Sequence, residues 1–112
     1  MSGITTHVLD TSRGRPAAGV PVTLEAEAAG GWRLVGKGTT NADGRISDLG
    51  IGESIAAGVY RLIFDTAVYF ASQNTKGFYP QVTVTFNIDD ATQHYHVPLL
   101  LNPFGYSTYR GS

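Results

Sequence analysis

Cysteine is absent from the 112-residue chain, which excludes disulfides, thiolate metal sites and thiol catalysis. Charge is also scarce, because Lys, Arg, Asp and Glu make up only 15% of the residues. The 8 basic and 9 acidic side chains give a net charge of −1 and form no basic stripe, so we expect no nucleic-acid partner. With 42% hydrophobic residues and so few charges, part of the surface is expected to face a partner subunit.

Long apolar segments are missing too. No run approaches the roughly 20 residues that a membrane-spanning helix needs, so we expect no membrane partner. Residues 1–6 lack the basic start and apolar stretch of a secretory signal. The sequence therefore predicts a cytoplasmic protein, with the periplasm as the alternative if a signal peptide has been removed.

Several common catalytic motifs do not occur either. No serine has the Gly-x-Ser-x-Gly context of a nucleophile elbow. Gly50-Ile51-Gly52 is too short for a phosphate-binding loop and is not followed by a helix signal, so nothing predicts a nucleotide cofactor. The length and the absence of repeats or linkers predict one domain over residues 1–112.

What the chain does contain is apolar and polar residues in alternation, interrupted by Gly, Pro and Asp-Gly. Asp43-Gly44 predicts a tight turn, because glycine tolerates a positive φ, and Arg45 leaves that turn as a strand begins. Asp65 is the predicted N-cap of one short helix, residues 66 to about 73. The other predicted strands are 4–9, 20–26, 32–37, 58–64, 82–88, 93–101 and 106–110. This pattern predicts an all-β fold, a two-sheet antiparallel sandwich of about eight strands with one short helix.

The three histidines are the first candidates for chemistry. Within a strand, His94 and His96 point to the same face, while the apolar residues between and after them point to the core. The same alternation directs His7 outward. From spacing alone three interpretations stay open: metal-free general acid/base pairs, a zinc site of three imidazoles, and solvated surface histidines. No carboxylate lies at a spacing that would support the metal.

Arg45 and the last four residues are the other candidates. An arginine after Asp-Gly is commonly solvated, but a fixed guanidinium there would also suit a carbonyl or an anion. Residues 109–112 bring a phenol, a guanidinium, a hydroxyl and a carboxylate, which suit a planar polar molecule.

Taken together, four segments resemble the 5-hydroxyisourate hydrolases, the transthyretin-like enzymes of urate breakdown. They are ITTHVLD at 4–10, DGR at 43–45, HYHVPLL at 94–100 and YRGS at 109–112. The last is the most specific, because it separates the hydrolases from transthyretin proper. FYPQVT at 78–83 also resembles the family, although Gln81 stands where a glutamate is expected.

The resemblance implies a transthyretin-like (prealbumin-like) fold, a homotetramer with a central channel, and 5-hydroxyisourate as substrate. It implies that water opens one lactam bond without a metal or another cofactor. The implied catalytic residues are His7, Arg45, His96 and Ser112, and the implied substrate-binding residues are His7, Arg45, Tyr109 and Arg110. His94 is left as a supporting or rim residue.

The main alternative is a transthyretin-like carrier, which would bind a small ligand in the tetramer channel without turnover. A carrier is expected to have a less polar channel and a different C-terminal segment. The imidazoles, the guanidinium and the YRGS segment therefore favour the hydrolase.

Overall fold

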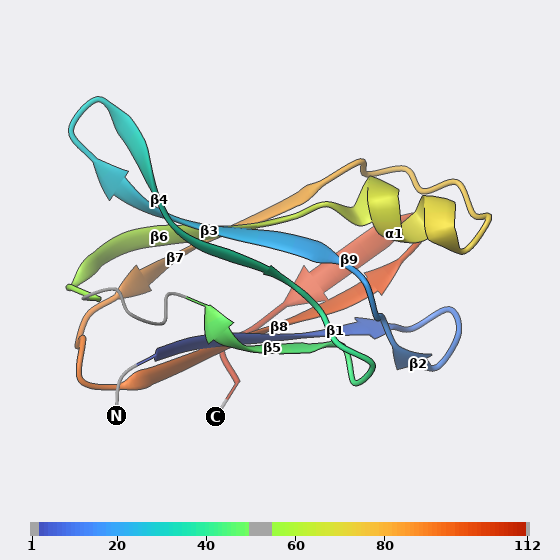
Figure 1. Ribbon diagram of the computed structural model, residues 1–112, viewed down its shortest axis with the longest axis horizontal. Helices are drawn as coiled ribbons and strands as arrows, with labels where there is room; N and C mark the ends of the chain where they lie inside the picture. The colour runs from blue at the N-terminus through green and yellow to red at the C-terminus, as the bar shows by residue number, and fades with distance from the viewer. Residues whose placement is uncertain (1–2, 50–54, 112) are drawn as a thin grey trace.

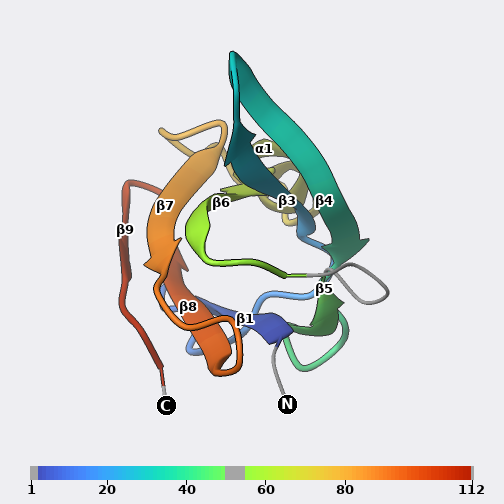
Figure 2. The ribbon, with the colours of Figure 1, turned by 90° about the vertical axis from the view of Figure 1, so that its left-hand side faces the viewer.

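Two β-sheets face each other in the computed structural model, which describes residues 3–49 and 55–111 (Figures 1 and 2). In the first sheet, β1 pairs with β8 on one side and with both β2 and β5 on the other, and β9 pairs with β8. The strands of this sheet are β1 (Gly3–Asp10), β2 (Arg15–Pro16), β5 (Arg45–Leu49), β8 (His94–Asn102) and β9 (Gly105–Thr108). The second sheet has the order β4-β3-β6-β7, with β3 (Pro21–Ala28), β4 (Gly31–Thr39), β6 (Gly58–Phe64) and β7 (Val82–Ile88).

The core lies between the sheets and follows directly from the alternating sequence. Along β1, every second residue from Ile4 is buried, and the residues between them are only partly buried. Side chains such as Leu24, Leu62, Phe64 and Leu99 are completely buried. Burial of each such side chain contributes about 1.5–3 kcal/mol, which holds the two sheets together. The alternation therefore directs His7, His94 and His96 to the outer face, as predicted.

The two-sheet all-β fold with one short helix is confirmed, but one strand pair is not antiparallel. β1 and β8 run parallel, with Thr5 opposite His96 and His7 opposite Pro98. Parallel neighbours need a long crossover connection. Here the connection includes the whole second sheet, so no local turn signal could reveal it. In the described part of the chain the strands number nine, including the two-residue β2.

The predicted turn at Asp43-Gly44 is confirmed. Gly44 has φ = +74°, and a Cβ there would collide with the carbonyl oxygen of Val8. Asn41 Oδ1 accepts hydrogen bonds from the backbone N–H of Asp43 (2.9 Å) and of Arg45 (3.0 Å). The flanking strands belong to different sheets, so the turn carries the chain across the sandwich and delivers Arg45 to the edge of β1.

The helix α1 (Thr66–Ser72) covers one end of the sandwich (Figure 1). Asp65 caps it as predicted, because its side chain accepts a hydrogen bond from the N–H of Val68 (3.3 Å). The helix ends one residue before the predicted position, with Gln73 as the C-cap. None of the helices in residues 3–49 and 55–111 has the length and apolarity to cross a membrane.

Asp10, at the end of β1, ties this helix to the first sheet. The carboxylate is 1% exposed and accepts hydrogen bonds from the Tyr69 hydroxyl (2.6 Å), the Ser12 hydroxyl (2.6 Å) and the Ser12 N–H (3.0 Å). Burial acts to raise the pKa of Asp10, but these hydrogen bonds outweigh it and the pKa is lowered. Burial and the Asp10 carboxylate raise the pKa of Tyr69 to about 12. The pair is therefore a neutral phenol donating to a buried anion.

Candidate active site

Three adjacent strands carry the predicted histidines and Arg45 to one outer face. β1 lies in the middle, with β5 on one side and β8 on the other. In the β1–β5 pairing, Arg45 is opposite His7, and in the β1–β8 pairing, His96 is opposite Thr5. Residues opposite each other in a sheet point to the same side. Side chains from the first strand, from the penultimate strand and from the strand that follows the Asp-Gly turn therefore meet on this face.

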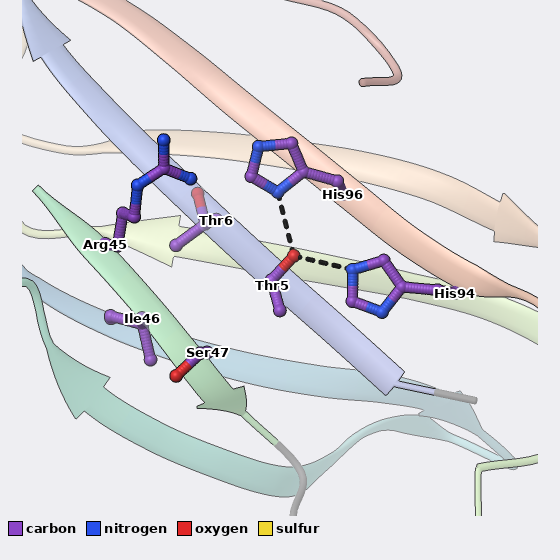
Figure 3. Close-up of a pocket in the computed structure, with 7 residues that line it drawn as sticks. All are labelled: Thr5, Thr6, Arg45, Ile46, Ser47, His94 and His96. Atoms are coloured by element: carbon purple, nitrogen blue, oxygen red, sulfur yellow. Dashed lines mark hydrogen bonds between the residues drawn. The ribbon is translucent and has the colours of Figure 1, made fainter. Parts of the chain in front are cut away.

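A cavity of about 240 Å³ opens between these strands, and we call it the site cavity (Figure 3). Its lining residues are Thr5, Thr6, Arg45, Ile46, Ser47, His94 and His96. The guanidinium of Arg45 and the imidazole of His96 lie on either side of β1 (Figure 3). His7 is not among the lining residues, but it is opposite Arg45 and its charge acts on His96. The structure thus brings His7, Arg45 and His96 together.

Thr5 is a member of this cluster that the sequence reasoning missed. Its Oγ1 is 2.9 Å from Nε2 of His94 and 2.8 Å from Nδ1 of His96. These hydrogen bonds hold both imidazoles over β1 (Figure 3). The alternation along β1 could have indicated this residue, because Thr5 and His7 share a face.

The electrostatics of the cluster favour neutral imidazoles. The pKa of His7 is lowered, first by burial and then by the positive charge of Arg45, while a hydrogen bond to the Asp43 backbone and the Asp43 charge oppose the shift. The pKa of His96 is also lowered, by burial first and then by Arg45, His7 and His94. An imidazole that stays neutral near pH 7 is available to accept a proton.

The segment after β9 continues along β8 and reaches His96. The N–H of Gly111 donates to the carbonyl oxygen of His96 at 2.8 Å. A Cβ on residue 111 would lie 2.6 Å from Cδ2 of His96, so the close approach requires glycine. Ser112, the fourth predicted catalytic residue, lies outside the described residues.

Tyr109 and Arg110 line a different cavity of the same chain. This edge cavity, of about 370 Å³, also takes residues from β7 and the inward face of β8. The Arg110 guanidinium stacks over the Tyr95 ring, 4.4 Å from its centroid, and donates to Gln93 Oε1 at 2.9 Å. Tyr109 is 57% exposed. Within one chain, neither residue lines the site cavity.

The geometry offers little to a metal ion. In the portion of the chain that the structure describes, no group of three or more His, Cys, Asp or Glu side chains is arranged to hold one. Nε2 of His94 and Nδ1 of His96 both hydrogen-bond the Thr5 hydroxyl. Imidazoles can accept and donate protons, and a guanidinium can bind an oxygen anion, so these are the reactions that the side chains of the cluster can support.

Known proteins resemble the chain over nearly its full length. The HIUase/Transthyretin family model matches residues 4–111. A 5-hydroxyisourate hydrolase of Salmonella dublin is 47% identical over 109 residues, which cover 97% of this chain and 80% of the relative. The solved 5-hydroxyisourate hydrolase of Klebsiella pneumoniae is 38% identical, with a TM-score of 0.85 and coverage of 100% of this chain and 94% of that one.

A carrier has the same fold. Sea bream transthyretin, solved in complex with thyroxine, has a TM-score of 0.89 over 96% of this chain and 93% of that one, at 34% identity. Similarity of fold alone therefore does not separate a hydrolase from a carrier. The side chains of the outer face must do so.

Proposed function

Because the chain belongs to the HIUase/transthyretin family, we propose that it is an enzyme that hydrolyses 5-hydroxyisourate in urate breakdown. This substrate is a planar bicyclic lactam, and water opens one of its lactam bonds to give 2-oxo-4-hydroxy-4-carboxy-5-ureidoimidazoline. The observation that carries the proposal is the meeting of Arg45 with His7 and His96, two imidazoles of lowered pKa, on one outer face.

The roles follow from the chemistry of the three groups. A neutral imidazole of the His7 and His96 pair takes a proton from water while the water oxygen bonds to the lactam carbonyl carbon. The carbonyl oxygen gains negative charge, which the Arg45 guanidinium stabilises. The tetrahedral intermediate then breaks its C–N bond, and an imidazolium gives the proton to the departing nitrogen. One water is consumed, and the protein returns to its starting state without a cofactor.

Ser112 completes the proposed catalytic set by orienting water or substrate through its hydroxyl or carboxylate. Its support is the packing of Gly111 against the His96 ring, one residue away in the chain. Tyr109 and Arg110 are proposed to bind substrate in the assembled protein rather than within a single chain. In the proposed homotetramer, dimers pack so that outward residues line a channel, and a second subunit brings further side chains to the site cavity.

The rival function is a carrier without turnover, and the sea bream transthyretin fold is its support. The site cavity argues against it, because Arg45, His94, His96 and Ser47 give this face a polar lining. The single-domain organisation over residues 1–112 and a cytoplasmic location stay predictions.

The deciding experiment adds the purified chain to freshly oxidised urate and follows the ultraviolet absorbance of the 5-hydroxyisourate that forms. We expect its decay to accelerate in proportion to protein concentration and to return to the spontaneous rate with His96→Ala. Decay at the spontaneous rate with the unmodified protein, together with tight binding of an aromatic ligand, would instead establish the carrier.

A further inference from the structure

The Thr5 hydroxyl lies between two imidazoles, and it has only one proton. Oγ1 is 2.9 Å from His94 Nε2 and 2.8 Å from His96 Nδ1. A hydroxyl can donate one hydrogen bond and accept others. When both rings are neutral, it must therefore donate to one of these nitrogens and accept from the other. The tautomers of His94 and His96 are coupled through Thr5.

The proposed hydrolysis selects the direction of this chain of hydrogen bonds. Thr5 and His96 are opposite each other in the parallel pairing, and the ring nitrogen of His96 that faces the Thr5 hydroxyl is Nδ1. A neutral imidazole has a hydrogen on one nitrogen and a lone pair on the other, so a His96 that accepts a proton at Nε2 must carry its hydrogen on Nδ1. The other ring nitrogen of His96 lies on the side of the ring away from Thr5 (Figure 3).

We propose that Thr5 is a positioning residue that holds neutral His96 with its hydrogen on Nδ1 and its Nε2 lone pair free to accept a proton from water. The Thr5 hydroxyl accepts from His96 Nδ1–H and donates to His94 Nε2. This inference rests on the proposed hydrolase function and assigns the base within the His7 and His96 pair. It also gives His94 a role, as the acceptor that fixes the direction of the Thr5 hydroxyl.

The proton balance of the step is simple. A water O–H bond breaks, its proton binds His96 Nε2, and the water oxygen bonds to the lactam carbonyl carbon. His96 is then an imidazolium, with its Nδ1–H still donated to Thr5. When the C–N bond breaks, the proton passes from the imidazolium to the departing nitrogen and His96 is neutral again.

A neutral orienting group suits this site. In Ser-His-Asp hydrolases a buried carboxylate fixes the histidine tautomer and stabilises the imidazolium. Among the described residues, the charged and titratable groups that act on His96 are Arg45, His7 and His94, and none is a carboxylate. A threonine fixes the tautomer without raising the pKa of His96 as an anion would. The lowered pKa and the fixed tautomer are therefore compatible.

The kinetic test compares three threonine variants. Thr5→Val keeps the shape of the side chain and removes the hydroxyl, and we expect kcat to fall about 10–100-fold with little change in KM, because the base loses its orientation. Thr5→Ser restores the hydroxyl and should recover kcat to within about 3-fold. The matched control is Thr23→Val, at a half-buried position of β3 away from the site cavity, which should keep the unmodified kcat.

A double-mutant cycle tests whether His94 acts on His96 through the Thr5 hydroxyl. His94→Phe, at an exposed position, should lower kcat in the unmodified background but cause no further loss in the Thr5→Val background. Independent losses that multiply would overturn the coupling through Thr5. An unmodified kcat in Thr5→Val, or a Thr5→Ser variant as slow as Thr5→Val, would overturn the positioning role.

Nitrogen-15 NMR of the ring nitrogens tests the same arrangement without turnover. Near pH 8, above the lowered pKa of His96, this ring should show a protonated Nδ1 and an unprotonated Nε2. The opposite tautomer would overturn the proposal even if Thr5→Val does not fold. A protein that shows the expected tautomer but does not hydrolyse 5-hydroxyisourate would refute the proposed function and leave the Thr5 arrangement standing.

Discussion

Replacing Arg45 with methionine removes the positive charge of the site cavity while keeping a long side chain there. In the structure this charge lowers the pKa of both His7 and His96, and it is the second-largest cause of the shift for each, after burial. The substitution therefore has two separate effects on catalysis. It removes the group that stabilises the tetrahedral oxyanion, and it raises the pKa of the bases.

The first effect sets the size of the loss. Removal of one positioned oxyanion donor typically lowers kcat by about 10²–10³-fold, or roughly 2.7–4 kcal/mol of activation free energy. We expect Arg45→Met to lose this much. Arg45→Lys keeps the charge but loses the planar donor fork, so its loss should be smaller.

The second effect sets the pH dependence. A base acts only when it is unprotonated, so kcat/KM falls as the pH drops through its pKa. Without Arg45 the pKa of His7 and of His96 moves up toward the ordinary value of 6.5. The acidic limb of the pH profile should therefore move to higher pH in Arg45→Met and stay nearly in place in Arg45→Lys.

The assay is the ultraviolet decay of 5-hydroxyisourate between about pH 5 and pH 9, corrected for the spontaneous rate. Arg15→Met, at an exposed position of β2, is the control for loss of one positive charge elsewhere. An acidic limb that stays in place or moves to lower pH in Arg45→Met would refute the electrostatic reasoning. Unmodified turnover in that variant would remove Arg45 from the site.

Three further predictions test other parts of the structure. His96→Ala should lower kcat at least about 10²-fold, and an unchanged kcat would contradict the catalytic role of His96. Its thermal unfolding, followed by circular dichroism, should stay nearly unchanged, because the His96 ring is only partly buried on the outer face. Tyr69→Phe should lower the free energy of unfolding by about 1.5–3 kcal/mol in urea titrations at pH 7, because Asp10 loses a hydrogen bond to its buried carboxylate. Since the pKa of Asp10 is lowered in the folded protein, this difference should shrink as the pH falls through that pKa, and an equal difference in acid would contradict the account. Dialysis against a chelator should leave turnover unchanged, and a loss that zinc restores would revive the three-imidazole metal site.

The alternation of apolar and polar residues was sufficient to predict which side chains face outward. His7, His94 and His96 are on the outer face because Ile4, Val8 and Val97 are in the core. That inference needs only the period of two along each strand. The prediction of the outer face was correct because it depends only on neighbouring residues within each strand.

Strand pairing was not predictable in the same way. Neither β1 nor β8 contains a signal that they should lie side by side and parallel, because pairing depends on the packing of the whole sandwich. The hydrogen bonds of Thr5 to the imidazoles depend on that register, so this residue was missed. The placement of Arg110 over Tyr95 depends on how the segment after β9 continues along β8.

The parallel pairing of β1 and β8 has a consequence for when activity can arise. Thr5 and His96 are 91 residues apart in the chain, yet their side chains hydrogen-bond each other in the site. Contacts between such distant segments form late and slowly during folding. A chain still emerging from the ribosome is therefore inactive until β8 has paired with β1. In refolding experiments, activity that returns after dilution from denaturant reports that the whole sandwich has formed, not one part of it.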